Sequence, residues 1–227
     1  MWVNGCLIGR NNSAYVPFRF DVTDFLNYGG DNAIVVRVDA SYGDGWFYEG
    51  AGLYRHVWLL KTNPVHLGRW DSVVRCKPGA GIAQVELSSV VFNTGTKPCS
   101  ASVVWTITDS SGVIATRARS SVQSVPAGLA VVFVATAQVS HPRTWSVQSP
   151  QLYNALVEVE CDDAIQDAEH VHFGIRSAVF DPDRGFFLNG EPPCTCFPIG
   201  TGPAGKAGRS RSGCIPIWMR SSCSLTM

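Results

Sequence analysis

The segment best equipped for chemistry is residues 44–52, where three consecutive aromatic side chains lie between two carboxylates. Aromatic faces stack on sugar rings, and carboxylates accept hydrogen bonds from hydroxyl groups. Two glycines at the end of the segment permit a tight bend, so the segment can project from a rigid domain towards a neighbouring pocket. We therefore predict a sugar-contacting loop that acts through Asp44, Trp46, Tyr48 and Glu49. The alternative is that its aromatic side chains only pack at a domain interface.

The remaining carboxylates do not form an obvious catalytic pair. General acid–base chemistry by carboxyl groups needs two of them within reach of one bond. The closest acidic clusters, Asp162–Asp163 and Asp181–Asp183, lie at apparent turns, where aspartate usually hydrogen-bonds its own backbone. We therefore expect both clusters to be structural, and we expect no catalytic residue in this chain.

Possible metal ligands are present, but they are too few at any one place. His170 and His172 are predicted to lie on one face of a strand, which would suit zinc, yet no third ligand can be identified. Cys194 and Cys196 lack a second pair at zinc-finger spacing. No glycine-rich phosphate loop precedes a helix, so nucleotide binding has no support. We expect neither a metal nor a cofactor.

The composition narrows the class of protein. The chain has 227 residues, of which 45% are hydrophobic and only 16% are charged, with 18 basic and 18 acidic side chains. This length is sufficient to bury a core, and a neutral chain without a basic block is a poor binder of nucleic acid. The longest apolar run, residues 129–137, is too short to cross a bilayer, and no signal peptide is visible. We expect no nucleic-acid partner and no membrane partner, and the localisation stays undetermined.

Residues 194–227 differ in composition from the rest of the chain. They contain four basic and no acidic residues, together with four of the eight cysteines. They are rich in glycine and serine and show no alternation, so we predict that this tail is disordered. The other four cysteines are scattered, which is typical of small buried hydrophobic residues and not of a disulfide framework.

Strand patterns dominate the chain as far as residue 192. Apolar and polar side chains alternate in residues 16–22, 34–39, 103–108 and 153–160, which predicts half-buried strands. Asn4-Gly5 predicts a type I′ hairpin, and residues 109–112 predict a second hairpin. The helical content that we expect is one short turn over Asp21–Leu26, capped by Thr23. The fold class is therefore all-β.

Four motif blocks in this order carry a family resemblance. They are residues 2–5, 15–22, 32–39 and 45–59, and the last block, which begins Gly-Trp-Phe-Tyr-Glu-Gly-Ala-Gly-Leu-Tyr-Arg, is the most specific. Further on, Trp145, Pro150, Leu152-Tyr153 and Phe173-Gly174-Ile175-Arg176 form a closing pattern. Together these residues resemble family 2 glycoside hydrolases, the β-galactosidase and β-glucuronidase family.

The resemblance implies a domain order. Residues 1–67 resemble the C-terminal part of the sugar-binding jelly-roll domain, and residues 68–173 resemble the immunoglobulin-like β-sandwich that follows it. Residues 174–193 resemble the segment that leads into the catalytic TIM barrel. The barrel itself, with its two catalytic glutamates, is absent, and residues 194–227 form an irregular, disordered or out-of-frame tail. The chain is thus expected to be a fragment: a partial jelly roll followed by an immunoglobulin-like sandwich.

The resemblance also implies a function. The parent enzyme would hydrolyse O-glycosyl bonds of β-galactosides or related β-glycosides, with the carbohydrate as its partner, and it could be an oligomer. In several relatives an acidic residue reaches the active site from the position that Trp46 occupies here, and the flanking Asp44 and Glu49 could substitute for it. The arginines of the motifs, Arg55 and Arg176, are expected to be ion-pair partners.

Two alternatives remain open. The chain could be a freestanding, non-catalytic carbohydrate-binding or adhesion module built from the same sandwiches. It could also be the product of a truncated or frame-shifted reading frame, which the abrupt change of character at Pro193 suggests.

Overall fold

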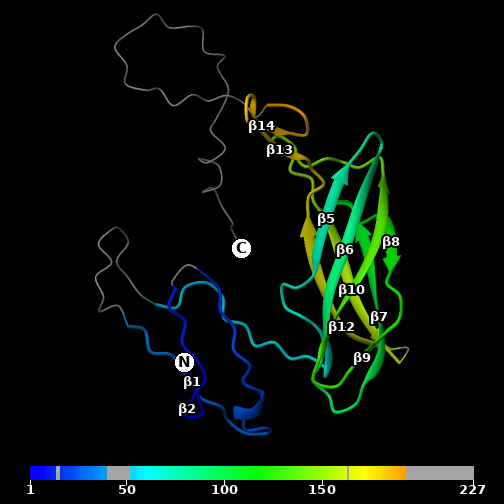
Figure 1. The fold of residues 1–227 in the computed structure, drawn as a ribbon. Coiled ribbons are helices and arrows are strands. Elements are labelled where there is room, and N and C mark those ends of the chain that lie inside the picture. Colours follow the sequence, from blue (N-terminus) through cyan, green and yellow to red (C-terminus); the bar gives the residue numbers. More distant parts are fainter. Residues whose placement is uncertain (14–15, 40–51, 163, 193–227) are drawn as a thin grey trace, which may run out of the picture. The chain divides into compact units, whose positions relative to one another are not determined.

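The computed structural model describes residues 1–13, 16–39, 52–162 and 164–192. The chain divides into two compact units, Met1–Leu60 and Lys61–Met227 (Figure 1). Among the described residues, the single helical element is the 3-10 turn η1 (Thr23–Phe25), and every sheet is antiparallel, so the predicted all-β class is confirmed. No helix in this part of the chain is long and apolar enough to cross a membrane. The tail that we predicted to be disordered lies outside the described residues.

The first unit is built around the predicted hairpin. Its three-stranded sheet has the order β2 (Cys6–Leu7), β1 (Trp2–Val3) and β3 (Ile34–Val35). Asn4 and Gly5 connect β1 to β2 with φ angles of 49° and 84°, so both residues adopt the positive φ that a type I′ turn requires. The side chain of Asn4 also accepts a hydrogen bond from the Ala33 N–H at 2.9 Å, which ties the turn to the start of β3.

Two expectations for the first unit are wrong. Residues 16–22 form no strand, because no other described segment of this unit pairs with them, and a strand without a partner forms no ladder of hydrogen bonds. The alternating run from residue 34 to 39 is in a strand only at Ile34–Val35. At η1 the N-cap position is Val22 and not Thr23, and no side chain caps the turn. The Asp21 carboxylate, one residue earlier, accepts hydrogen bonds from both the N–H and the hydroxyl of Thr23.

The second unit is a two-layer sandwich. Its strands are β4 (Val65–Leu67), β5 (Val73–Pro78), β6 (Ile82–Asn93), β7 (Cys99–Thr108), β8 (Ile114–Arg119), β9 (Gln123–Val125), β10 (Ala130–Ser140), β11 (Tyr153–Cys161) and β12 (Ala164–Phe173). The four-stranded sheet has the order β10-β6-β4 with β5 beside β6, and the five-stranded sheet has the order β12-β11-β7-β8 with β9 beside β7. The two layers approach each other at both edges, where β8 meets β10 and β12 meets β4 (Figure 1).

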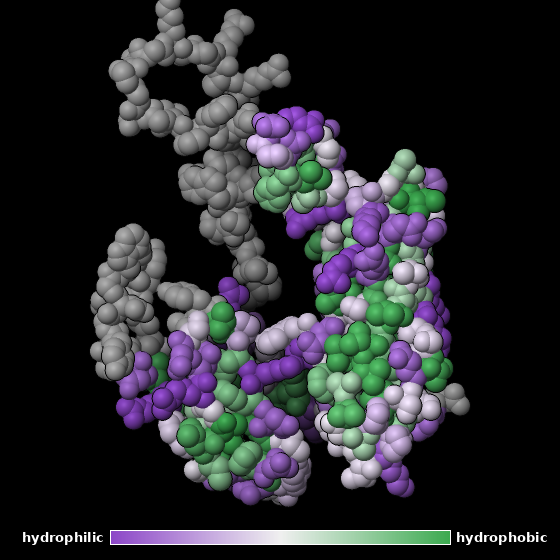
Figure 2. All heavy atoms as spheres, viewed as in Figure 1, coloured by the Kyte–Doolittle hydropathy of each residue, from purple (hydrophilic) through white to green (hydrophobic). Residues whose placement is uncertain are grey.

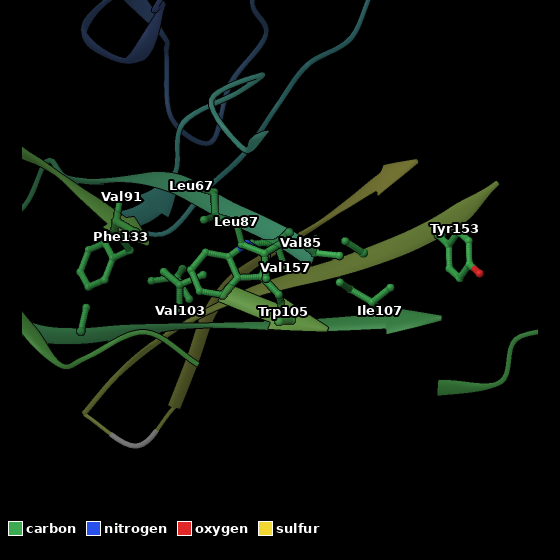
Figure 3. Packing of buried hydrophobic residues seen from close by; sticks show 14 of the residues in the cluster. Leu67, Val85, Leu87, Val91, Val103, Trp105, Ile107, Phe133, Tyr153 and Val157 are labelled. Carbon is green, nitrogen blue, oxygen red and sulfur yellow. The ribbon is translucent and has the colours of Figure 1, made fainter. Parts of the chain in front are cut away.

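The core fills the space between these two sheets. Trp105 on β7 is fully buried and lies among side chains of both layers (Figure 3). Strand β11 behaves as its alternation predicted, since its buried residues are Tyr153, Ala155, Val157, Val159 and Cys161, with half-buried residues between them. Burial of large apolar side chains of this kind is the main stabilising contribution to such a fold.

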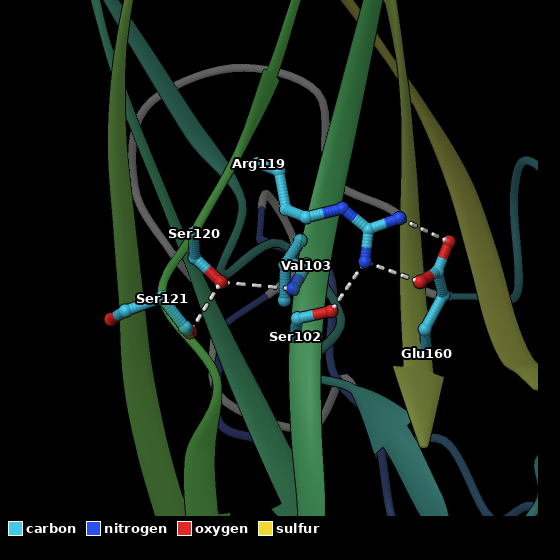
Figure 4. A network of polar contacts seen from close by, with 6 residues as sticks. All are labelled: Ser102, Val103, Arg119, Ser120, Ser121 and Glu160. Atoms are coloured by element: carbon cyan, nitrogen blue, oxygen red, sulfur yellow. Dashed lines mark hydrogen bonds and ion pairs between the residues drawn. The ribbon is translucent and has the colours of Figure 1, made fainter. Parts of the chain in front are cut away.

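Strand β7 departs from the prediction of one exposed face. Its polar residues Ser102 and Thr106 are buried as well, because arginines of the neighbouring strand β8 lie across them. Arg117 Nε donates to Thr106 Oγ1 at 3.0 Å. Arg119 donates to Ser102 Oγ at 2.9 Å and makes a bidentate pair with Glu160 on β11, at 2.6 and 3.1 Å (Figure 4). Long arginine stems therefore shield the outer face of a central strand.

The outer face of the four-stranded sheet has a different character. Val132 and Val134 on β10 point outward and are 55% and 62% exposed. Figure 2 shows hydrophobic side chains gathered on the side of the second unit that carries β6 and β10. Exposed apolar surface of this kind is typical of a packing interface.

A short hairpin follows the sandwich. It consists of β13 (Ala178–Asp181) and β14 (Gly185–Leu188). At its turn, Asp181 accepts hydrogen bonds from the backbone N–H groups of Asp183 and Arg184, which confirms the predicted structural role of this acidic cluster. The Arg184 guanidinium also donates to Asp181 at 2.7 Å, and these contacts hold the pKa of the Asp181 carboxyl below its usual range.

Candidate functional site

The predicted sugar-contacting loop lies outside the described residues, since Asp44, Trp46, Tyr48 and Glu49 all fall within residues 40–51. The chain that follows it is described from Gly52 onward and continues the aromatic character of the loop. Tyr54 is exposed, and the exposed Trp58 lies edge-on to His56 with ring centroids 5.3 Å apart. Exposed aromatic rings that lie this close together can stack on an apolar surface or on the face of a sugar ring. Trp58 was not predicted from the sequence as a site residue.

The two motif arginines make different contacts. Among the described residues, neither Arg55 nor Arg176 forms an ion pair with a carboxylate, and their role as ion-pair partners stays a prediction. Arg55 adopts a φ angle of 68°, which is unusual for a residue with a side chain. Arg176 lies over the ring of Trp145, with its Cζ atom 4.7 Å from the ring centroid. This distance is typical of a cation–π contact.

The motif residues around Trp145 form one connected cluster. The backbone N–H of Trp145 donates to the backbone carbonyl of Ile175 at 2.8 Å. The Trp145 carbonyl accepts a hydrogen bond from Asn189 Nδ2 at 2.9 Å, and Asn189 Oδ1 in turn accepts one from the Ser177 N–H. The cluster therefore attaches the β13–β14 hairpin to the end of the sandwich. The contacts of these motif residues show a packing role.

Gly174 lies against Trp145 in this cluster, and its substitution tests the packing. A Cβ atom at this position would meet Trp145 Cβ at 2.9 Å and Cγ at 3.0 Å, which is too close for ordinary contact. Gly174→Ala should therefore displace Trp145 and destabilise the second unit by about 1–3 kcal/mol. Chemical denaturation followed by circular dichroism measures this difference. The control is Ala168→Ser, because Ala168 is exposed on β12. Gly112→Ala is not a suitable control, because Gly112 has a φ angle of 81°, which alanine rarely adopts. Equal stability of Gly174→Ala and Ala168→Ser would contradict the packing.

An open depression of about 880 Å³ lies at one end of the five-stranded sheet. Its lining residues are Asp109, Ser110, Gly112, Pro150, Gln151, Leu152, Tyr153, Asn154, His170 and His172. The predicted turn at residues 109–112 is confirmed here: Asp109 Oδ1 accepts hydrogen bonds from the N–H groups of Ser111 and Val113. Ser110 Oγ donates to Gln151 Oε1 at 2.9 Å. Much of the polar surface of the depression is thus already engaged in local hydrogen bonds.

The two histidines lie on the same face of β12, as predicted. His172 is opposite Asn154 on β11, and the side chain of Asn154 hydrogen-bonds His170 Nδ1 at 3.0 Å. Both imidazoles are exposed. Within the described ranges, no group of three or more His, Cys, Asp or Glu side chains could hold a metal ion. The strand register that brings Asn154 to His170 could not be read from the sequence, so the depression was not predicted.

Comparison with known proteins identifies the second unit. Residues 71–176 match the sequence model of the family described as Glycosyl hydrolases family 2. The chain is 31% identical over 193 residues to beta-galactosidase BoGH2A of Bacteroides ovatus and 24% identical over 213 residues to a beta-glucuronidase of Formosa agariphila. It superposes on a family 2 glycosyl hydrolase from Bacteroides cellulosilyticus with a TM-score of 0.79 and 29% identity, over 84% of this chain and 26% of that one.

These relatives are much longer than this chain. The matches cover 84% of the chain but only 23% of the Bacteroides ovatus protein and 22% of the Formosa agariphila protein. The chain therefore spans about a quarter of the length of the relatives that it matches. Residues 71–176 thus match glycosyl hydrolases family 2, and relatives from that family match 84% of the chain.

Proposed function

We propose that this chain supplies the accessory β domains of a family 2 glycoside hydrolase that acts on β-galactosides or related β-glycosides. The observation that carries the proposal is the family match over residues 71–176, which contain β5 to β12. The names of the relatives support the substrate class, since they are β-galactosidases and β-glucuronidases. In this proposal the catalytic acid and nucleophile belong to the part of the relatives that this chain does not match.

We further propose that residues 1–67 correspond to the end of a jelly-roll domain, residues 68–173 to the immunoglobulin-like sandwich and residues 174–193 to the segment that leads into the barrel. The exposed valines of β10 are consistent with a domain that packs against other parts of an enzyme. The loop of residues 44–52 contributes the contact with the sugar, through Asp44, Trp46, Tyr48 and Glu49. A whole enzyme of this kind could be oligomeric.

A chromogenic assay tests the proposal. The isolated chain should not hydrolyse nitrophenyl β-galactoside or β-glucuronide above the buffer rate, because removing both reacting carboxyl groups typically costs many powers of ten in rate. The same chain joined to the remaining three quarters of a family relative should hydrolyse one of the two substrates. Turnover that co-purifies with the isolated chain would show that the reacting groups are present in it.

The alternative function is carbohydrate binding without catalysis. The exposed Trp58 and the open depression on the five-stranded sheet are the features that favour it. Titration of the isolated chain with β-galactosides in a calorimeter separates the two functions. Saturable binding by the isolated chain, together with no hydrolysis by the joined protein, would favour the binding module.

A further inference from the structure

Two cysteines from distant parts of the sequence meet inside the second unit. Cys99 is the first residue of β7 and Cys161 is the last residue of β11, and these strands are neighbours in the five-stranded sheet. Cys161 lies directly opposite Ala101. Because side chains alternate along a strand, Cys99 and Ala101 point to the same face. Cys99 and Cys161 are therefore diagonal neighbours on the inner face of the sheet.

The two thiols differ in their surroundings. Cys161 is only 4% exposed and belongs to the core, whereas Cys99 is half-buried and packs against the core from its edge. Burial raises the pKa of the Cys161 thiol to about 12, with further contributions from a hydrogen bond to Cys99 and from the charge of Asp162. The more accessible thiol is thus the diagonal neighbour of a buried one.

We propose that Cys99 and Cys161 are a thiol modification site, which a low-molecular-weight disulfide such as glutathione disulfide converts into an intramolecular disulfide between β7 and β11. Cys99 reacts first because it is the accessible member of the pair. The structure assigns no such pair to the other described cysteines: Cys6 is in the first unit, and Cys76 is on β5 in the opposite sheet.

The reaction balances in two exchange steps. The Cys99 thiolate attacks one sulfur of the small disulfide, the sulfur–sulfur bond of that disulfide breaks, and one small thiolate leaves. The Cys161 sulfur, having lost its proton to solvent, then attacks the Cys99 sulfur of the mixed disulfide and displaces the second small thiolate. Both protein thiols are oxidised, the small disulfide is reduced to two thiols, and the two protons released by the protein are taken up by the two leaving thiolates.

The diagonal placement predicts a reversible bond. Diagonal neighbours in a sheet have Cα atoms about 7–8 Å apart, whereas a disulfide prefers less than about 7 Å. Closing the bond therefore requires a small backbone movement, which is easiest at the end of a strand, where both cysteines lie. A strained disulfide is more readily reduced than a relaxed one. We expect that a dithiol reductant restores the two thiols without unfolding the protein.

Peptide mapping of the oxidised chain tests the proposal. The folded full-length chain is incubated with glutathione disulfide at mildly alkaline pH, remaining thiols are alkylated in denaturant, and the digest is analysed by mass spectrometry. The expected product is a peptide pair joined through Cys99 and Cys161, absent after dithiothreitol.

Matched variants identify the residues. In Cys99→Ser the joined peptides should be absent, and no glutathione should be attached at position 99. In Cys161→Ser the reaction should stop at the mixed disulfide between glutathione and Cys99. Cys76→Ser should leave the joined peptides unchanged. The proposal is overturned if the wild-type chain stops at the mixed disulfide, if Cys99 joins a cysteine of residues 194–227 instead, or if the pair forms only in denaturant. Mapping of the wild-type chain decides the question even if a variant fails to fold.

Discussion

Replacing Trp105 by alanine should destabilise the second unit by about 3–5 kcal/mol and lower its Tm by about 10–20 °C. Trp105 is 0% exposed and is the largest of the fully buried side chains. It lies opposite Val157 on β11 and faces the four-stranded sheet, so its removal leaves a cavity between the layers (Figure 3). The surrounding strands are held by ladders of hydrogen bonds on both sides and can close such a cavity only in part.

The control for this prediction is Val134→Ala. Val134 is 62% exposed on the outer face of β10, so its truncation should change the free energy of unfolding by no more than about 0.5 kcal/mol. Denaturant titration of both variants, followed by circular dichroism, measures the two values under the same conditions. Similar destabilisation by the two substitutions would mean that Trp105 is not at the centre of the core.

The second large effect is expected at the loop of residues 44–52. In a whole enzyme that contains this chain, Trp46→Ala or Glu49→Ala should lower kcat/KM by about tenfold to a hundredfold, corresponding to the loss of about 1–3 kcal/mol of substrate contact. The physical reason is that an aromatic face and a carboxylate each make one contact that water does not replace equally well. The prediction rests on the proposed function, so it is meaningful only once the joined protein hydrolyses a β-glycoside.

The control and the competing explanation can be separated in the same experiment. Tyr28→Ala removes an aromatic side chain of the same unit that is 77% exposed and whose hydroxyl donates to the Thr23 carbonyl, and it should leave kcat/KM unchanged. If the loop only packs at a domain interface, Trp46→Ala should lower the Tm and leave kcat/KM per folded molecule unchanged. That outcome would remove the loop from the substrate site.

The sequence alone was sufficient for features that depend on neighbouring residues. The Asn4-Gly5 turn, the Asp109 turn and the Asp181 turn all form where they were predicted, because each is decided by the φ angles and side-chain hydrogen bonds of a few consecutive residues. The alternation of β11 also predicted its buried face correctly. The family resemblance was visible for the same reason, since its motif blocks are short and local, and the comparisons confirm it.

Features that depend on distant partners could be decided only by the tertiary structure. The alternating residues 16–22 form no strand, because a strand exists only where another segment supplies its hydrogen bonds. Ser102 on β7 is buried because Arg119 of the next strand and Glu160 of another strand close over it (Figure 4). Strand register likewise brings Cys99 beside Cys161. The candidate sugar loop remains a prediction from the sequence, because Asp44, Trp46, Tyr48 and Glu49 lie outside the described residues.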